Sequence, residues 1–274
     1  MTYSANLNGV DMGGETIYRW RTTPTGMGHG TIAGSLITRA GVDGVFPLGT
    51  DTLPARIIAF DLYWVGDDAA AVERSGRTLA IAWTPQRSGT TNLTFTVADD
   101  ELVCFGRPRL FEMDLSYASS GHGRARCEFE ATDPRLFSST TNSIVLGLVA
   151  GGGRTYPRTY PLTYGAGSDS DGVAVNAGTF ETDWTATIVG PVTTPRITLG
   201  ETGQLVELDG VVPSGSTLVV SSADGSVLLD GSPRPGWPTL VSRFFKLSAG
   251  SNTIRFRAAS GTGSCTFSWR HAKL

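Results

Sequence analysis

Short runs in which apolar and polar residues alternate recur along the chain, and this period of two is typical of half-buried β-strands. The clearest pair of runs is Arg109–Tyr117 and Arg124–Thr132, separated by the loop sequence ASSGHG. One face of the second run carries Ala125, Cys127, Phe129 and Ala131. Two alternating runs around a short glycine-containing loop predict an antiparallel hairpin.

The remaining pattern of the first half predicts further strands and one short helix. β-Branched and aromatic residues favour strands at 15–23, 55–65, 78–84, 91–97 and 102–106. The helix is expected to start at Asp67 or Asp68 as N-cap and to stop at Gly76, because the three alanines between them favour helix. The first 140 residues therefore read as a β-rich domain with one short helix.

The pattern changes in the segment 148–172, which is rich in Gly, Pro and Tyr and has little periodicity. Beyond Val173, strand-like runs return every 8–12 residues, which is typical of a sandwich or barrel. They comprise 184–190, 195–201, 204–210, a hairpin over 217–231, then 239–247, 252–258 and 264–272. The predicted organisation is a first domain over 1–140, a connection over 141–172 and a second domain over 173–274.

Charge and cysteine usage narrow the class of protein. The net charge is −3, with 22 Lys and Arg against 25 Asp and Glu, and neither half carries the basic footprint that nucleic-acid binding requires. The three cysteines are odd in number and widely spread, unlike a secreted disulfide scaffold. No signal peptide and no apolar run of about 18 residues is apparent, so we expect a soluble chain made in a cytoplasm.

The residues that first suggest catalysis are Glu128 and Glu130. On an extended strand they share a face about 6.5–7 Å apart, within the range of glycosidase carboxylates. Catalytic pairs usually lie on different strands across a cleft, however, and simple alternation opposite Cys127 and Phe129 predicts the same residues without any chemistry. We interpret both glutamates as the solvated face of a strand.

The other candidate residues lack the neighbouring residues that a metal or catalytic site needs. His29, His122 and His271 have no metal-ligand spacing, and no G-x-S-x-G nucleophile motif occurs. The sequence GSDSDG is only a fragment of a calcium loop. We therefore predict no catalytic residues, no metal site and no cofactor. Trp237, in the loop sequence SPRPGWPT, is the best candidate for an exposed aromatic platform that contacts a glycan.

Several segments resemble the distal tail proteins of long non-contractile-tailed bacteriophages. They are the seam FEATDPRLFS at 129–138, VNAGTFETDWTATIVGPVTTPRI at 175–197, GSTLVVSSADGSVLLDG at 215–231 and the ending LSAGSNTIRF with CTFSWRHAKL. The segment AGVDGVFPLG at 40–49 also fits, more loosely. The similarity covers about residues 125–274 and extends weakly over the first 120.

This resemblance implies a fold and a structural role without catalysis. The expected fold is mainly β, with an N-terminal β-rich belt domain that has one short helix and closes a homohexameric ring. A C-terminal galectin-like antiparallel β-sandwich follows. The expected partners are other copies of the chain, the tail tube protein, the tip hub or tail-associated lysin, and receptor-binding proteins, with no nucleic acid and no membrane. The expected location is the virion tail tip, after assembly in the host cytoplasm.

Two other functions remain open from the residues alone. The sandwich could be a carbohydrate-binding module that contacts host cell-wall glycans, or the chain could be a glycoside hydrolase. For the segment around Asp133, Pro134 and Arg135 we predict a structural seam. Pro134 ends the strand because it has no N–H to donate, and Asp133 and Arg135 fix the departing chain by local capping or pairing.

Overall fold

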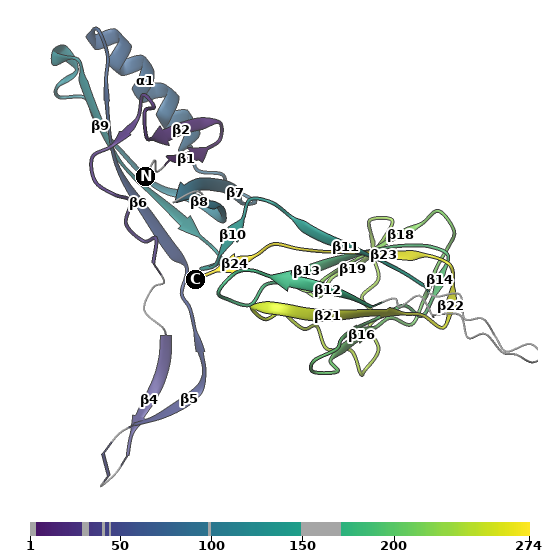
Figure 1. Cartoon of the computed structure of the whole chain (residues 1–274). Coiled ribbons are helices and arrows are strands. Elements are labelled where there is room, and N and C mark those ends of the chain that lie inside the picture. Colours follow the sequence, from purple (N-terminus) through teal and green to yellow (C-terminus); the bar gives the residue numbers. More distant parts are fainter. Residues whose placement is uncertain (1–3, 29–32, 40–41, 44, 98–99, 149–170) are drawn as a thin grey trace, which may run out of the picture. The chain divides into compact units, whose positions relative to one another are not determined.

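The computed structural model describes residues 4–28, 33–39, 42–43, 45–97, 100–148 and 171–274. The chain forms two compact units, Met1–Ser139 with the terminal Leu274, and Thr140–Lys273. Both units consist mainly of antiparallel strands, and one α-helix occurs among the described residues (Figure 1). The predicted fold class is thereby confirmed.

The first unit is a twisted antiparallel sheet with the strand order β2, β1, β7, β8, β9, β6 and β3, and β10 also pairs with β8. Its strands are β1 (Ser4–Leu7), β2 (Val10–Gly13), β3 (Arg19–Trp20), β6 (Arg56–Val65), β7 (Thr91–Val97), β8 (Asp100–Asp114), β9 (His122–Ala131) and β10 (Leu136–Ser138). A separate two-stranded sheet is formed by β4 (Ala33–Thr38) and β5 (Val45–Thr52), and a short 3-10 helix, η1, covers Ala118–Ser120.

The predicted hairpin is the pair β8 and β9, in which Met113 lies opposite Ala125 and Phe111 opposite Cys127. The register shifts between Pro108 and Leu110, so that β8 is one bent strand where two shorter strands were predicted. The predicted inner face of β9 is confirmed, since all four of its apolar residues are buried.

The helix α1 (Ala69–Ala82) is longer than the sequence pattern predicts. Asp68 is the N-cap, and its carboxylate accepts the backbone N–H of Ala71 at 2.6 Å. The helix runs through Gly76, where we predicted its end, and it includes most of the predicted strand 78–84. Both predictions were wrong. Gly76 does not end the helix but serves close packing, since a Cβ there would lie 2.6 Å from Sδ of Met113 and 3.2 Å from the ring of Trp64.

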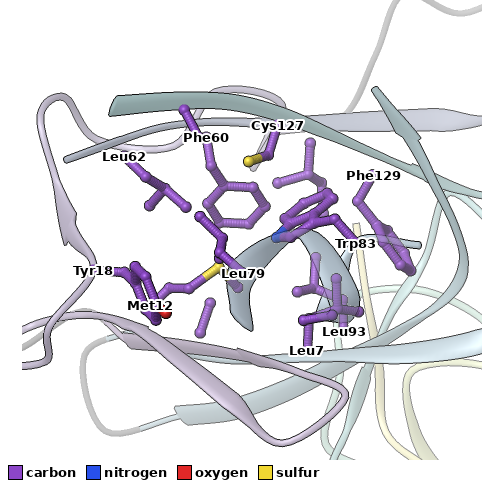
Figure 2. Close-up of a cluster of buried hydrophobic side chains, with 14 of the residues drawn as sticks. Leu7, Met12, Tyr18, Phe60, Leu62, Leu79, Trp83, Leu93, Cys127 and Phe129 are labelled. Carbon is purple, nitrogen blue, oxygen red and sulfur yellow. The ribbon is translucent and has the colours of Figure 1, made fainter. Parts of the chain in front are cut away.

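The core of the first unit lies between α1 and the sheet. Figure 2 shows Leu79 and Trp83 from the end of the helix among side chains of several strands, including Phe60, Cys127 and Phe129. Trp83 and Phe60 meet edge to face, with ring centroids 5.8 Å apart. The helix therefore closes one face of the sheet.

The second unit contains two larger sheets around one core. The first has the order β11, β23, β13, β18, β19, β20, and the second has β12, β21, β15, β16. The bounds are β11 (Asn142–Gly147), β12 (Asp171–Asn176), β13 (Trp184–Val189), β15 (Arg196–Leu199), β16 (Leu205–Glu207), β18 (Thr217–Ser221), β19 (Val227–Leu229), β20 (Ser232–Pro233), β21 (Gly250–Arg257) and β23 (Ser264–Trp269). Smaller strands are β14 (Val192–Thr193), β17 (Val211–Val212), β22 (Ser260–Gly261) and β24 (Ala272–Lys273).

Stacked aromatic rings fill the centre of the second unit. Trp184 lies 4.9 Å from Phe267 and 5.0 Å from Phe245, centroid to centroid, and its indole N–H donates to the carbonyl of Phe245 at 2.8 Å. The predicted strand 239–247 is wrong. Residues 239–247 form a loop whose backbone donates hydrogen bonds to neighbouring strands, for example from the N–H of Arg243 to the carbonyl of Leu205 at 2.7 Å.

The structure also bears on the predicted connection over 141–172. Residues 142–147 form β11, which pairs along its length with β23 of the second unit. Residues 149–170 lie outside the described residues, and β12 begins at Asp171. The strands of the second unit thus begin before the predicted connection ends.

We predict that Gly123→Ala destabilises the first unit. Gly123 lies in β9 against Trp64, and a Cβ there would come within 2.3 Å of the buried indole. Such overpacking should lower the free energy of unfolding by about 1–3 kcal/mol. Urea denaturation followed by tryptophan fluorescence measures the loss.

The matched control for this substitution is Gly28→Ala, because a Cβ at Gly28 meets nothing within 4 Å and Gly28 has no positive φ. It should leave the free energy of unfolding of the first unit within about 0.5 kcal/mol of the wild type. Equal midpoints for the two variants would show that the contact between Gly123 and Trp64 does not limit stability.

Candidate functional site

The seam at Asp133, Pro134 and Arg135 is a compact turn that links β9 to β10. The Asp133 carboxylate accepts the backbone N–H of Arg135 at 2.9 Å. It also accepts the guanidinium of Arg135, with Nε at 2.9 Å and Nη2 at 2.6 Å. The side chain thus fixes the backbone and neutralises the arginine two residues later.

The seam is largely withdrawn from water. Arg135 is only 8% exposed, and its guanidinium lies 5.2 Å from the ring of Phe137, which in turn meets Phe105 at 5.8 Å. Nearby Arg56 is 5% exposed and donates from Nη1 to the carbonyl of Met27 at 2.9 Å. Burial lowers the pKa of Arg56, and the Cys104 and Asp133 groups oppose that shift.

A second feature is the hairpin of β4 and β5, which we call the arm (Figure 1). Ile37 and Phe46 lie opposite each other across its two strands and are 51% and 54% exposed. The guanidinium of Arg39 lies 4.1 Å from the ring of Phe46. A two-stranded hairpin is marginally stable in water, so an exposed apolar pair on one indicates a packing partner.

An apolar cavity of about 220 Å³ opens in the same unit. Its lining consists mostly of aromatic and aliphatic side chains, namely Trp20, Thr23, Pro24, Met27, Phe60, Phe95 and Val97. The rings of Trp20 and Phe60 are 6.3 Å apart. Such a cavity suits an inserted apolar side chain better than a polar substrate.

The candidate catalytic and metal-binding residues are not brought together. Glu128 bonds to Arg126 at 3.0 Å on its own strand, and Glu130 is half-buried on the same face. His122 is exposed on β9, whereas His271 accepts the backbone N–H of Ala177 at 3.1 Å. His29 and most of the GSDSDG segment lie outside the described residues.

No group of three His, Cys, Asp or Glu side chains in the described ranges is placed to hold a metal ion. No helix in the described part of the chain is long and apolar enough to cross a membrane.

Comparison with known proteins identifies the second unit. Residues 177–272 match the family model of the siphovirus-type tail component, C-terminal domain. The second unit thus resembles the C-terminal domain of siphovirus-type tail components, and we call it the tail component domain. No curated protein matches the chain in sequence.

Solved structures extend the likeness to the whole chain at the level of fold. The Dit protein of phage SPP1, described as a paradigm of the hub adsorption apparatus in phages that infect Gram-positive bacteria, superposes with a TM-score of 0.71 at 16% identity over 100% of both chains. A chain of the phage p2 baseplate in its activated conformation superposes with a TM-score of 0.54 at 12% identity over 97% of both chains. The suspected resemblance to distal tail proteins is confirmed, and it indicates a structural role in a phage tail.

In the tail component domain, Trp237 is half-buried. Its indole packs over Gly210, where a Cβ would lie 2.6 Å from the ring, and its carbonyl accepts the N–H of Asp209 at 2.7 Å. One face of the ring is therefore used within the domain. Glycan contact at Trp237 stays a prediction.

We predict that Asp133→Ala destabilises the first unit by about 2–4 kcal/mol, because it leaves the buried Arg135 without the carboxylate. Asp133→Asn keeps one acceptor oxygen for the backbone N–H of Arg135, so its loss should be about half as large. Urea denaturation of the two variants measures the difference. Wild-type stability in Asp133→Ala would rule out a structural seam.

We also predict that the thiols are unreactive in the folded chain. Cys104, Cys127 and Cys265 are buried and free, and burial raises the pKa of Cys104 and of Cys265 to about 12. Burial shifts the pKa of Cys127 in the same direction. At pH 8 all three are protonated and shielded, so a disulfide reagent should react only as the chain unfolds.

Spectrophotometric titration with such a reagent, with and without denaturant, checks this expectation. Three equivalents should appear promptly in denaturant and slowly in buffer. A fast phase of one equivalent in buffer would identify a reactive cysteine and argue against three inert core thiols.

Proposed function

We propose that the chain forms a homohexameric ring at the phage tail tip, which joins the tail tube to the tip hub or baseplate. The observation that carries this proposal is the match of fold over the full length of the SPP1 Dit protein. The proposed partners are further copies of the chain, the tail tube protein, the hub or tail-associated lysin, and receptor-binding proteins. The ring acts by holding these parts together and performs no catalysis.

Assembly in the host cytoplasm and a final place in the virion follow from this proposal. Neither requires a cofactor. The acidic balance of the chain, net −3, also suits a protein that contacts other proteins and not nucleic acid.

The surface features of the first unit support self-association. The arm exposes Ile37 and Phe46, which lose most of their contact with water if a neighbouring copy covers them. Each side chain is about half exposed, so covering it contributes about half of the 1.5–3 kcal/mol of full burial, or about 0.8–1.5 kcal/mol. In a closed ring every copy both offers and receives the same contact, so this gain is repeated at each interface.

The apolar cavity beside Trp20, Met27 and Phe60 fits the same scheme. It lies in the same unit as the arm and takes one or two apolar side chains. We propose that a neighbouring copy supplies them. The ring would then be built from surfaces of the first unit, which leaves the tail component domain free for other contacts.

Light scattering coupled to size exclusion tests the ring. Six chains of 28.9 kDa should give about 173 kDa. The double variant Ile37→Ser with Phe46→Ser should raise the concentration at which the ring dissociates by at least about tenfold. The free energy of burial lost from the two side chains together exceeds about 1.4 kcal/mol, which corresponds to a factor of ten.

A matched double variant removes exposed apolar side chains elsewhere in the same unit. Ile17→Ser with Ile81→Ser changes residues that are 62% and 74% exposed and lie outside the arm. This control should keep the mass of the wild type. A wild-type chain that stays monomeric at every concentration would refute the ring, and an arm variant that still forms hexamers would refute the arm as its contact.

A further inference from the structure

The outer face of the four-stranded sheet in the tail component domain carries three charged side chains in one row. In the strand register, Glu207 of β16 lies opposite Arg196 of β15, and Arg196 lies opposite Arg257 of β21. The residues next to them in each strand, Val206, Ile197 and Phe256, are buried in the core. The row therefore points away from the core, with two arginines side by side.

A polar cleft of about 210 Å³ lies at this row. It is lined by Thr194, Arg196, Glu207, Arg257, Ala258 and Ala259. The two alanines leave open space next to the charged side chains. The cleft is smaller than the roughly 300–1,000 Å³ of drug-sized pockets, so it fits one small group.

Arg196 is the side chain in this cleft with unused donors. Among the described residues, none accepts a hydrogen bond from its guanidinium, and its nearest carboxylate oxygen, Oε2 of Glu207, is 3.8 Å from Nη1. That distance is an ion contact too long for a hydrogen bond. Arg257, by contrast, is held by Asp171 at 2.8 Å.

The two arginines repel each other across the strands, because like charges directly opposite are unfavourable. The carboxylates of Glu207 and Asp171 belong to the two flanking strands, β16 and β12. The space between Arg196 and Arg257 is thus a focus of positive charge that an anion would relieve.

Thr194 gives an independent indication of a ligand. Its φ is +48°, a left-handed conformation that is costly for a β-branched residue. The bond from its N–H to the carbonyl of Gly210, 2.8 Å long, holds it there, and its hydroxyl bonds to none of the described residues. Strained residues of this kind concentrate at ligand sites.

We propose that this cleft binds an oxyanion whose carrier also bears a hydroxyl group, such as an acidic or phosphorylated sugar. The oxyanion lies between Arg196 and Arg257 and accepts their N–H groups. The hydroxyl donates to Glu207, which would repel a bare anion. Neither contact depends on ring assembly.

Amide chemical shifts of the ¹⁵N-labelled full chain test the site with four probes: D-glucuronate, D-glucose 6-phosphate, D-glucose and inorganic phosphate. The first two share a ring with glucose and differ in the oxyanion. At least one of them should shift the amides of Thr194, Arg196, Ala258 and Ala259, and which one does so tells a carboxylate from a phosphate ligand. Binding should be at least about tenfold tighter than that of glucose or of phosphate alone.

Two arginine variants locate the contact. Arg196→Gln should weaken binding about tenfold or more, whereas Arg255→Gln should stay within about twofold of the wild type. Arg255 lies on the same strand as Arg257 and pairs with Asp171 at 3.2 Å, but it does not line the cleft. Unchanged melting temperatures show that both variants fold.

Glu207→Gln separates the two halves of the proposal. It should lower the preference for the sugar acid over inorganic phosphate, because the charged acceptor of the hydroxyl is lost while the charge that repels a bare anion is removed.

Four results overturn the proposal. One is the absence of any shift at the cleft with both sugar acids at about 50 mM, well above the millimolar range expected for a small cleft. A second is binding that survives Arg196→Gln. Glucose that binds as tightly as the acids refutes the oxyanion contact, and inorganic phosphate that does so refutes the hydroxyl contact.

Discussion

The architecture of the first unit depends on how Trp64 of β6 joins the helix to the sheet. Its buried indole N–H donates to the carbonyl of Val72 in α1 at 3.0 Å, so the hydrogen-bonding need of a side chain from the sheet is met by the backbone of the helix. Two glycines make room for the ring: a Cβ would come within 2.3 Å of it at Gly123 of β9 and within 3.2 Å at Gly76 of α1. Since a buried indole needs both an acceptor and space, the position of the helix and the register of β6 on β9 are fixed together.

Much of this could be predicted from the sequence, because the signals are local. The alternation along β9 shows which side chains face the core, and Asp68 accepts one of the free N–H groups of the first helical turn, that of Ala71. The end of the helix could not be predicted in the same way. Residues 78–84 form a short apolar run that suits strand or helix, and only the packing of Gly76 against Met113 and Trp64 shows why it does not end the helix.

The candidate sites also differ in whether their contacts are local in the sequence. Asp133 and Arg135 pair within three residues, so their contact was foreseeable from the sequence Asp-Pro-Arg. The exposure of Ile37 and Phe46 was not, because it depends on a hairpin that forms its own sheet. The cleft at Arg196 and Arg257 brings together residues 61 positions apart, and only the strand register places them side by side.

The contrast between the two sets of charged residues explains why pattern alone misleads about function. Glu128 and Glu130 are conspicuous in sequence because they are close together. Both lie on β9 in the middle of a sheet, however, and Glu128 is neutralised by Arg126. Arg196 and Glu207 attract no notice in sequence, since each is an ordinary outward residue of its own strand. Their charges stay incompletely paired next to an open cleft, and incomplete pairing at a cavity indicates binding better than spacing along a strand.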